Sequence, residues 1–334
     1  MEKKLRTYQR ACRQATDWLL SFANPDGSIG PTRDHLFYYR IPWALALMGE
    51  LRAAGRILDW IHENMFNPQG AFEGVSPQGV FQQRYGSYPL ACLLVGAALM
   101  QRFDLVYAGT RHLLTWQDPQ SGGFYSSRTN TGPSGEQELF PAAQGGMSFL
   151  LVGQLEAALK AGEFLARMWE LQPAADEKLY HVYSPGKGLI RDYPAAEEAE
   201  YLTRKDAPWQ HHFNGGIAAA LLTKLHMATG KSRWLELAQD YQDFSMTTHE
   251  CQFQSMQTCK SGWGAGLLYL VTREQRYCDW TTRMGDWFVG NQHPEGYWEN
   301  TRYWTPAPTT ADRIHITAEF IMHMAHIITY LSVD

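Results

Sequence analysis

Four side chains that could transfer a proton or stabilise a negative charge stand close to the start of apolar segments of the chain. They are Arg40, His211, Lys260 and His315. A histidine can shuttle a proton near neutral pH, and a buried cation can polarise a substrate oxygen. Each also has a structural interpretation, because a buried arginine or lysine needs a carboxylate partner and many buried histidines are only hydrogen-bonded core residues. The sequence predicts these four residues as catalytic candidates.

Two carboxylates, Glu138 and Asp312, complete the predicted catalytic residues. Glu136 and Glu138 are two residues apart and point in different directions if they are helical, so we do not expect them to act as a cooperative pair. Helix capping is the competing interpretation for one of these glutamates and for Asp312.

Aromatic, histidine and amide side chains surround the same positions and predict a substrate-binding surface. Arg40 and Trp43, for example, are three residues apart and share one face of a helix. Packing in the core is the alternative role for each aromatic residue. The predicted substrate-binding residues are Tyr39, Trp43, Tyr85, Tyr88, Gln144, His212, Asn214, Gln257, Trp263 and Trp304.

Composition argues against several functional classes. A net charge of -5 without a polybasic stretch does not suit a nucleic-acid binder. The five cysteines are odd in number and widely spaced, which fits neither a disulfide framework nor a ribbon-type metal site. No apolar leader and no run of about 18 apolar residues is present, and motifs for nucleotides, acyl transfer and zinc peptidases are missing. We expect a cytoplasmic enzyme with a small hydrophobic substrate, no membrane insertion, no metal and no cofactor.

The elements that must position these side chains alternate between two kinds of helix. The segment from Leu5 to Phe22 is apolar on one face only, whereas residues 41–51, IPWALALMGEL, are apolar nearly all round. The same pair recurs six times, with a period of about 45 to 50 residues. A solenoid would leave its inner row half exposed, so the alternation favours a closed ring with six outer and six inner helices. We expect one domain over residues 1–334, with a long connection at 173–210 that forms a lid or a short hairpin.

The turns between the two helices of a pair also repeat. They read NPDGSIG at 24–30, NPQGAF at 67–72, QDPQSGGF at 117–124 and QHPEGYW at 292–298. Proline ends the preceding helix, and glycine adopts left-handed angles cheaply. The last turn matches the Q-x-x-[DE]-G-x-W repeat of triterpene cyclases, and the third is similar to the P-x-G-G-F turns of protein prenyltransferase β subunits. The chain thus resembles the terpenoid cyclase and protein prenyltransferase superfamily, which implies an all-α (α/α)6 toroid.

The catalytic motifs of that superfamily are missing. The D-x-D-D stretch of hopene-type cyclases occurs nowhere, and Asp34 and Asp312 are isolated. The zinc ligands of the prenyltransferases are matched only loosely, by residues 249–251, His-Glu-Cys, and a distant His315. The resemblance therefore implies the ring but not the reaction.

Three functions remain open at this point. The first is a cofactor-independent cyclase or isomerase of a hydrophobic natural-product intermediate, including a pericyclic cyclisation, in which Arg40, His211, Lys260 or His315 supplies one activating hydrogen bond. The second is a carbohydrate-active enzyme such as a glycosidase, uronate lyase or sugar epimerase. The third is a binding module without activity. Aromatic walls with one or two cations would favour cyclisation, and several facing carboxylates would favour sugar chemistry.

Overall fold

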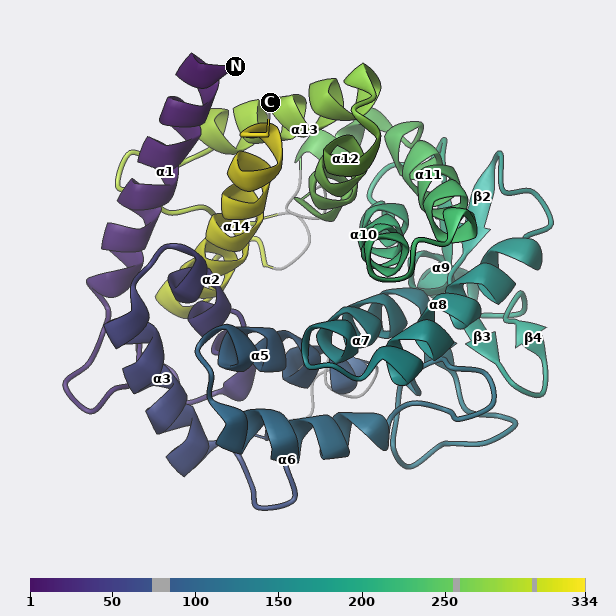
Figure 1. Ribbon diagram of the computed structural model, residues 1–334, viewed down its shortest axis with the longest axis horizontal. Helices are drawn as coiled ribbons and strands as arrows, with labels where there is room; N and C mark the ends of the chain where they lie inside the picture. Colours follow the sequence, from purple (N-terminus) through teal and green to yellow (C-terminus); the bar gives the residue numbers. More distant parts are fainter. Residues whose placement is uncertain (74–84, 255–258, 302–304, 334) are drawn as a thin grey trace.

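The chain winds around a central axis as a double ring of helices, and the computed structural model describes residues 1–73, 85–254, 259–301 and 305–333 (Figure 1). The outer helices are α1 (Glu2–Leu20), α3 (Leu51–Asn64), α6 (Phe103–Leu114), α8 (Leu155–Glu170), α11 (Ser232–Met246) and α13 (Gln275–Gly290). The inner helices are α2 (Ile41–Leu47), α5 (Ser87–Leu99), α7 (Leu139–Leu151), α10 (Phe213–Thr229), α12 (Cys259–Thr272) and α14 (Thr310–Leu331). The ring closes where α1 packs against α13 and α14. The predicted all-α toroid is confirmed.

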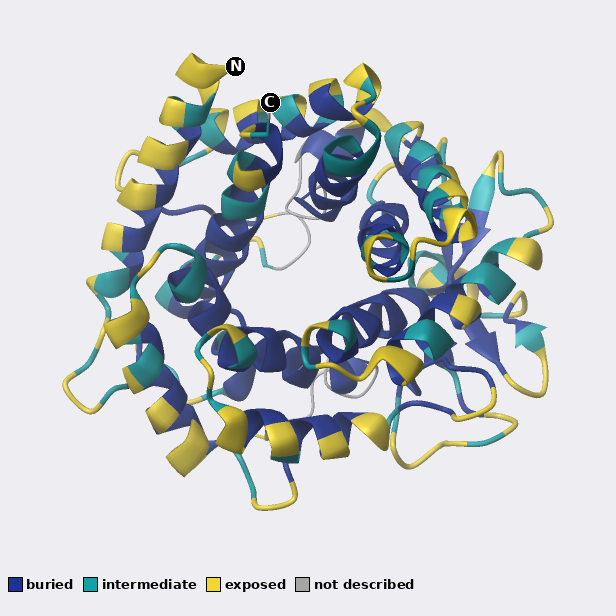
Figure 2. Cartoon of the chain, in the orientation of Figure 1, coloured by how far each residue is buried: buried dark blue, intermediate teal, exposed yellow. Residues whose placement is uncertain are grey.

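The two layers differ in burial in the way that their sequences require. In α5 every residue from Ser87 to Ala97 is buried, whereas α1 buries only the face that carries Tyr8, Ala15 and Leu19 (Figure 2). One predicted boundary is wrong, because α2 stops at Leu47 and does not continue to Leu51. Gly49 has a φ of +77° there, which ends the helix and lets Leu51 begin the next outer helix.

The repeated turns hold four of the six outer helices against the next one. Their glycines have positive φ, and an added Cβ would lie 2.1 to 3.0 Å from a backbone carbonyl oxygen of the following outer helix. Only glycine allows this approach. The four pairs are Gly27 with Arg56, Gly70 with Ala108, Gly122 with Lys160, and Gly296 with Gln14.

Glutamine side chains fasten two of these turns. The Gln117 amide donates to the carbonyl oxygens of Gly122 and Ala157, at 3.0 and 2.9 Å. The Gln292 amide donates to those of Gly296 and Ala11, both at 2.9 Å. The second set lies between the last outer helix and the first, so the turn that matches the cyclase repeat helps to close the ring.

The long connection at 173–210 carries most of the strands. These are β2 (Lys178–Tyr180), β3 (Val182–Ser184), β4 (Gly188–Leu189) and β5 (Leu202–Arg204), with the short helices η2 (Ala195–Glu197) and α9 (Glu198–Tyr201). The β3–β4 pair is antiparallel, as the expected hairpin requires, and β3 also pairs with β1 (Gln137–Glu138), while β2 pairs with β5. Two further 3-10 helices are η1 (His35–Phe37) and η3 (Glu250–Gln254). None of the helices within the described ranges is long and apolar enough to cross a membrane.

Replacing Gly122 with alanine should destabilise the protein more than the same change at Gly153. Both glycines have a φ near +80°, so both variants incur the left-handed strain of about 1–2 kcal/mol. Only at Gly122 does the new Cβ meet a carbonyl oxygen, at 2.1 Å, whereas nothing lies within 4 Å at Gly153. Urea unfolding should show about 2 kcal/mol of additional loss for Gly122→Ala. Equal losses would mean that the close approach of turn and helix contributes nothing.

Candidate functional site

Side chains from the starts of five inner helices and from the first half of α14 meet around the ring axis. We call this set the collar. Its aromatic half runs from α2 to α10 through four rings in contact. Tyr39 lies 6.0 Å from Tyr88, Tyr88 lies 5.2 Å from Phe140, and Phe140 lies 5.2 Å from Phe213, measured between ring centroids. The remaining members of the collar are Arg40, Lys260, His315 and Glu319.

The charged half of the collar is centred on Glu319. Its Oε1 accepts from Lys260 Nζ at 2.8 Å and lies 3.1 Å from Arg40 Nη2. The Glu319 side chain is fully buried, whereas those of Arg40 and Lys260 keep 5% and 8% of their surface. The two cations therefore stand at the edge of the cluster, and the carboxylate stands behind them.

Burial and charge act in opposite directions on these groups. Burial raises the pKa of Glu319, but the adjacent Arg40 and Lys260 outweigh it and hold that pKa well below its usual range. Burial lowers the pKa of Lys260, and its neighbours Cys259 and Glu319 more than compensate, so the ammonium stays charged. Arg40 and Lys260 each form an ion pair, which was one of the interpretations that the sequence offered. Both pairs share the carboxylate of Glu319.

His315 is a neutral imidazole beside this cluster. Its Nε2 lies 2.7 Å from Arg40 Nη1, and a guanidinium can only donate, so Nε2 accepts and the proton is on Nδ1. Burial, followed by the charge of Arg40, lowers the pKa of His315 to about 3. The Tyr39 ring, at 5.3 Å, packs against the imidazole and closes the collar.

The last inner helix presents a polar stripe, of which the sequence pointed to His315 and to Glu319 one turn beyond it but not to His323 and His326. His315, Glu319, His323 and His326 follow one another at spacings of four, four and three, which places them on one helix face. His323 Nε2 lies 3.8 Å from Glu319 Oε1. That spacing was the available signal, but the apolar residues around it suggested a core helix.

A second group of polar side chains comes from the 173–210 connection. Glu200 lies on helix α9, and its Oε2 accepts a hydrogen bond from the hydroxyl of Tyr85. The Oε1 of Glu200 lies 3.8 Å from Nε2 of His211. The rings of His181 and His211 are 5.5 Å apart, and the His211 ring lies 5.1 Å from Phe213 of the collar. Sequence reasoning missed Glu200 and His181, because no periodicity marks a residue in an irregular connection.

Two predicted amides are buried and lack partners for some of their polar atoms. Gln144 lies on α7 one turn beyond Phe140, and its amide nitrogen has no hydrogen-bond partner within the described parts of the chain. Asn214 lies on α10 beside Phe213, and the same holds for both its side-chain polar atoms. Both residues are 1% exposed. Such groups are costly to bury without a partner, which favours a polar ligand near them.

Three other predicted residues have contacts outside the collar. Glu138 is fully buried and accepts from the hydroxyl of Ser126 at 3.2 Å. Asp312 forms a capping box with Thr309, which is the structural alternative that the sequence offered. His212 Nε2 lies 3.7 Å from the sulfur of Cys251, and burial lowers the pKa of His212 to about 4.

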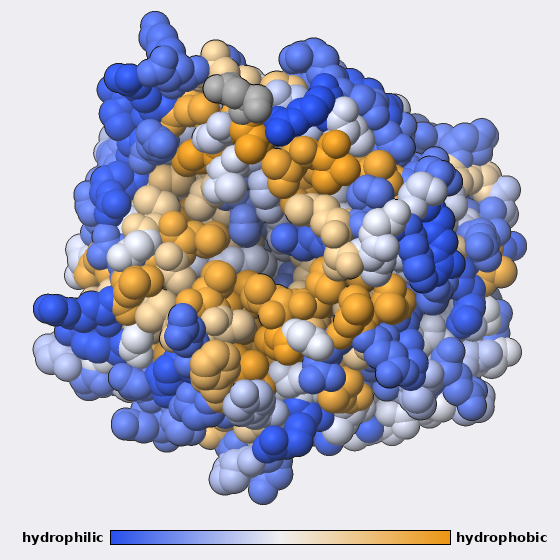
Figure 3. Space-filling view, viewed as in Figure 1, coloured by the Kyte–Doolittle hydropathy of each residue, from blue (hydrophilic) through white to orange (hydrophobic). Residues whose placement is uncertain are grey.

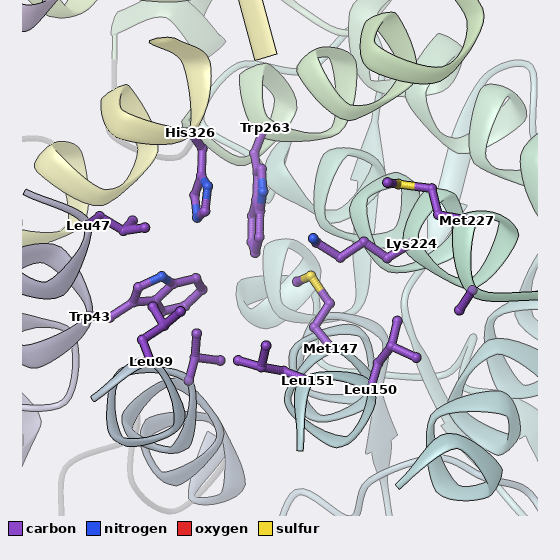
Figure 4. A pocket seen from close by; sticks show the side chains of 12 residues that line it. Trp43, Leu47, Leu99, Met147, Leu150, Leu151, Lys224, Met227, Trp263 and His326 are labelled. Atoms are coloured by element: carbon purple, nitrogen blue, oxygen red, sulfur yellow. The ribbon is translucent and has the colours of Figure 1, made fainter. Parts of the chain in front are cut away.

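Trp43 and Trp263 do not lie in the collar. Each is three residues after a collar cation and shares its helix face, yet three residues advance about 4.5 Å along a helix. That rise carries both rings toward the opposite end of the ring, where they line a separate pocket of about 470 Å³ (Figure 4). Trp43 therefore lines this pocket and Arg40 does not, although the two share a helix face. Gln257 and Trp304 lie outside the described residues.

One group of side chains has the composition of a metal site. Cys259, Glu319 and His323 are all buried, and their ligand atoms lie within 4.8 Å of one another. The Lys260 ammonium already donates to Glu319, and burial raises the pKa of the Cys259 thiol to about 12. The Lys260 ammonium thus already neutralises Glu319, and the Cys259 thiol is protonated. A metal ion would have to displace Lys260 from Glu319.

No family model and no curated protein matches the sequence. Among solved structures, a D-mannose isomerase is similar with a TM-score of 0.67 and 14% identity, covering 94% of this chain and 96% of that one. A family 76 α-mannanase from Bacteroides thetaiotaomicron has a TM-score of 0.66 and 12% identity, over 96% and 95%. A type II terpene cyclase from Scytonema has a TM-score of 0.59 and 14% identity, over 99% and 100%. At these identities the likeness shows the toroid fold alone, and most of the similar structures are carbohydrate-active enzymes.

Replacing Glu319 with glutamine should cost about 3–5 kcal/mol of stability, because it leaves two buried cations without a counter-charge. The matched control is Glu299→Gln, which removes an outer carboxylate that pairs with Arg313. Partly exposed pairs contribute at most about 1 kcal/mol. Chemical unfolding of both variants at neutral pH provides the comparison, and similar small losses would show that the Glu319 cluster is not an ion-pair network.

The protein should lose stability when the pH falls from 7 to 5, in part through His323. Burial lowers the pKa of His323 to about 4 in the folded state, while the unfolded chain titrates near 6.5. Below pH 6.5 only the unfolded state takes up this proton, so stability falls until the pH reaches the folded pKa. His323→Gln should reduce the change in unfolding free energy between pH 7 and 5 by about 2 kcal/mol. An unchanged pH dependence in His323→Gln would show that the buried imidazole does not contribute.

Proposed function

We propose that the protein is a cofactor-independent isomerase or epimerase that moves a proton between neighbouring carbon atoms of a monosaccharide. The observation that carries the proposal is the pairing of Arg40 with a neutral His315 in a collar of aromatic rings. Aromatic faces suit the apolar faces of sugars, and cations suit the oxygen on which negative charge develops when a proton leaves the adjacent carbon. The sugar-isomerising and sugar-cleaving enzymes among the similar structures support the substrate class.

Histidine chemistry fits the collar better than hydrolysis by a carboxylic acid. A glycosidase needs a carboxyl group that is protonated at working pH and a second carboxylate about 5–10 Å away. Glu319 is the carboxylate of the collar, and its pKa is shifted in the opposite direction. Its role is to hold Arg40 and Lys260 in place and charged.

The reaction divides among the side chains as follows. His211, oriented by Glu200, takes the proton from the carbon next to the carbonyl group. Arg40 and Lys260 stabilise the negative charge on the carbonyl oxygen, and His315 donates from Nδ1 to a substrate oxygen. Return of the proton to the former carbonyl carbon, with transfer of the hydroxyl proton between the two oxygens, gives the isomer. Protonation of the original carbon on the opposite face by a second donor, such as water, while His211 keeps the proton it took and later releases it to solvent, gives the epimer.

A cyclase of a hydrophobic natural-product intermediate, including a pericyclase of secondary metabolism, is the second candidate. The apolar pocket with Trp43 and Trp263 and the similarity to a terpene cyclase favour it. The collar, with aromatic walls and two cations, also meets the criterion that the sequence set for cyclisation. That criterion was too coarse, because two cations beside a neutral imidazole suit the carbonyl oxygen of a sugar equally well. The comparisons favour the carbohydrate alternative.

The cysteines support a cytoplasmic location for this activity. All five are buried and none forms a disulfide. Buried thiols persist in a reducing compartment, where disulfides do not form.

Incubation with aldoses and ketoses in D2O should incorporate deuterium at the carbon next to the carbonyl group. Proton NMR with mannose, fructose, glucose and N-acetylmannosamine as probes would show loss of that carbon-bound signal, with or without a new sugar. His211→Gln should lower the exchange rate by about 10²- to 10⁴-fold, the usual contribution of a general base. His62→Gln is the control, because His62 is exposed on an outer helix.

Two results would overturn the proposal. Release of sugars from mannan or unsaturated glucuronides without deuterium exchange would identify a glycoside-cleaving enzyme. Conversion of polyenes by a protein that exchanges no sugar proton would identify the cyclase.

A further inference from the structure

A second pocket opens at the end of the ring opposite to the collar. Residues in the last turns of four inner helices line it, as Leu47, Leu99, Leu151 and Ala228 show. Its volume is about 470 Å³, within the range of pockets that bind small organic molecules. Figure 3 looks into this end, where apolar side chains surround a central hollow. The walls are aliphatic, thioether and aromatic, so they suit an apolar molecule.

One charged residue, Lys224, stands in this apolar lining. It projects from α10, and Figure 4 shows its side chain directed into the pocket. It has no ion pair or hydrogen bond with any side chain in the described parts of the protein. Lys224 is partly buried, and this burial is the cause that lowers its pKa. An ammonium group in apolar surroundings is stabilised when an anion joins it.

The pocket is separate from the collar. Trp263 lies between them, with its ring 5.4 Å from that of His326 on the pocket side and 5.4 Å from that of His323 next to Glu319. Trp43 packs against both Trp263 and His326, at 5.9 and 5.8 Å. A molecule in this pocket would therefore contact neither Arg40 nor Lys260.

We propose that this pocket binds an amphipathic carboxylate, a molecule with one apolar chain or ring system and a single carboxylate that pairs with Lys224. The walls bind the apolar body and Lys224 selects the anion. A phosphate or sulfate would need several donors, and the lining offers few. Burial lowers the pKa of His326 to about 3, so it is neutral, and the indole nitrogen of Trp263 already donates to the hydroxyl of Tyr330 at 3.3 Å. One cation in an apolar pocket matches one negative charge on an apolar body.

Three ligands with the same ten-carbon chain test the proposal on the whole protein. They are decanoate, decanol and decyltrimethylammonium, and binding is followed by calorimetry and by quenching of tryptophan fluorescence. Decanoate should bind at least tenfold more tightly than decanol, and the cation should bind least.

Two variants assign the binding to this pocket. Lys224→Met keeps the length and apolar stem of the side chain, and it should remove the preference for decanoate over decanol while decanol binding persists. Lys231→Met is the matched control, since Lys231 is exposed just beyond the same helix. Leu151→Trp should fill the pocket and weaken both ligands. Thermal melting of each variant shows that it is folded.

The proposal fails if decanoate and decanol bind the unaltered protein equally, or if Lys224→Met leaves the preference intact. It also fails if Leu151→Trp weakens neither ligand, since binding would then be elsewhere. These outcomes are independent of deuterium exchange in sugars, which concerns the collar.

Discussion

The ring depends on one buried carboxylate that has to meet two cations from distant parts of the chain. Glu319 belongs to the last inner helix, Arg40 precedes the first, and Lys260 opens the fifth. Each of these charges would be costly if buried alone, so the three are stabilised only when α14 lies between α2 and α12. The same contact that closes the inner ring also places the cations beside His315. Closure of the fold and assembly of the candidate site are therefore one event.

The outer ring closes by a different means, through backbone approach instead of charge. At four turns a glycine faces a carbonyl group of the next outer helix, and the last of these joins the end of the chain to α1. These turns are on the periphery and carry no candidate catalytic residue. This division explains why the turn motif of the cyclases is present while their acidic motif is missing, because the motif encodes the scaffold and leaves the reaction open.

The sequence predicted the ring well, because its signal is the local alternation of one-faced and wholly apolar helices. It also placed Arg40, Lys260 and Tyr88 at the starts of inner helices, where the structure has them, and their role in function stays a prediction. It gave no position along the axis, since Trp43 shares a helix face with Arg40 and yet lines the pocket at the other end of the ring. It also missed Glu200, whose place depends on how a long irregular connection folds over the ring. Local periodicity carries no information about such tertiary contacts.

The inner helices all run the same way, since the collar lies toward their N-terminal ends and the opposite pocket lies beside the last turns of α2, α5, α7 and α10. Their dipoles therefore add, and the interior of the ring has an electrical polarity, with partial positive charge at the collar and partial negative charge at the pocket. In the proposed reaction this field would favour the oxyanion at the first end, and at the second it offsets only part of the cost of burying the Lys224 ammonium, whose pKa stays lowered. It also means that a small anion gains little at the second end, because the carbonyl groups of the helix ends oppose it. An anion with an apolar body, as we propose for this pocket, would gain enough from the apolar walls to bind against that field, so the scaffold's polarity would favour different ligands at its two ends.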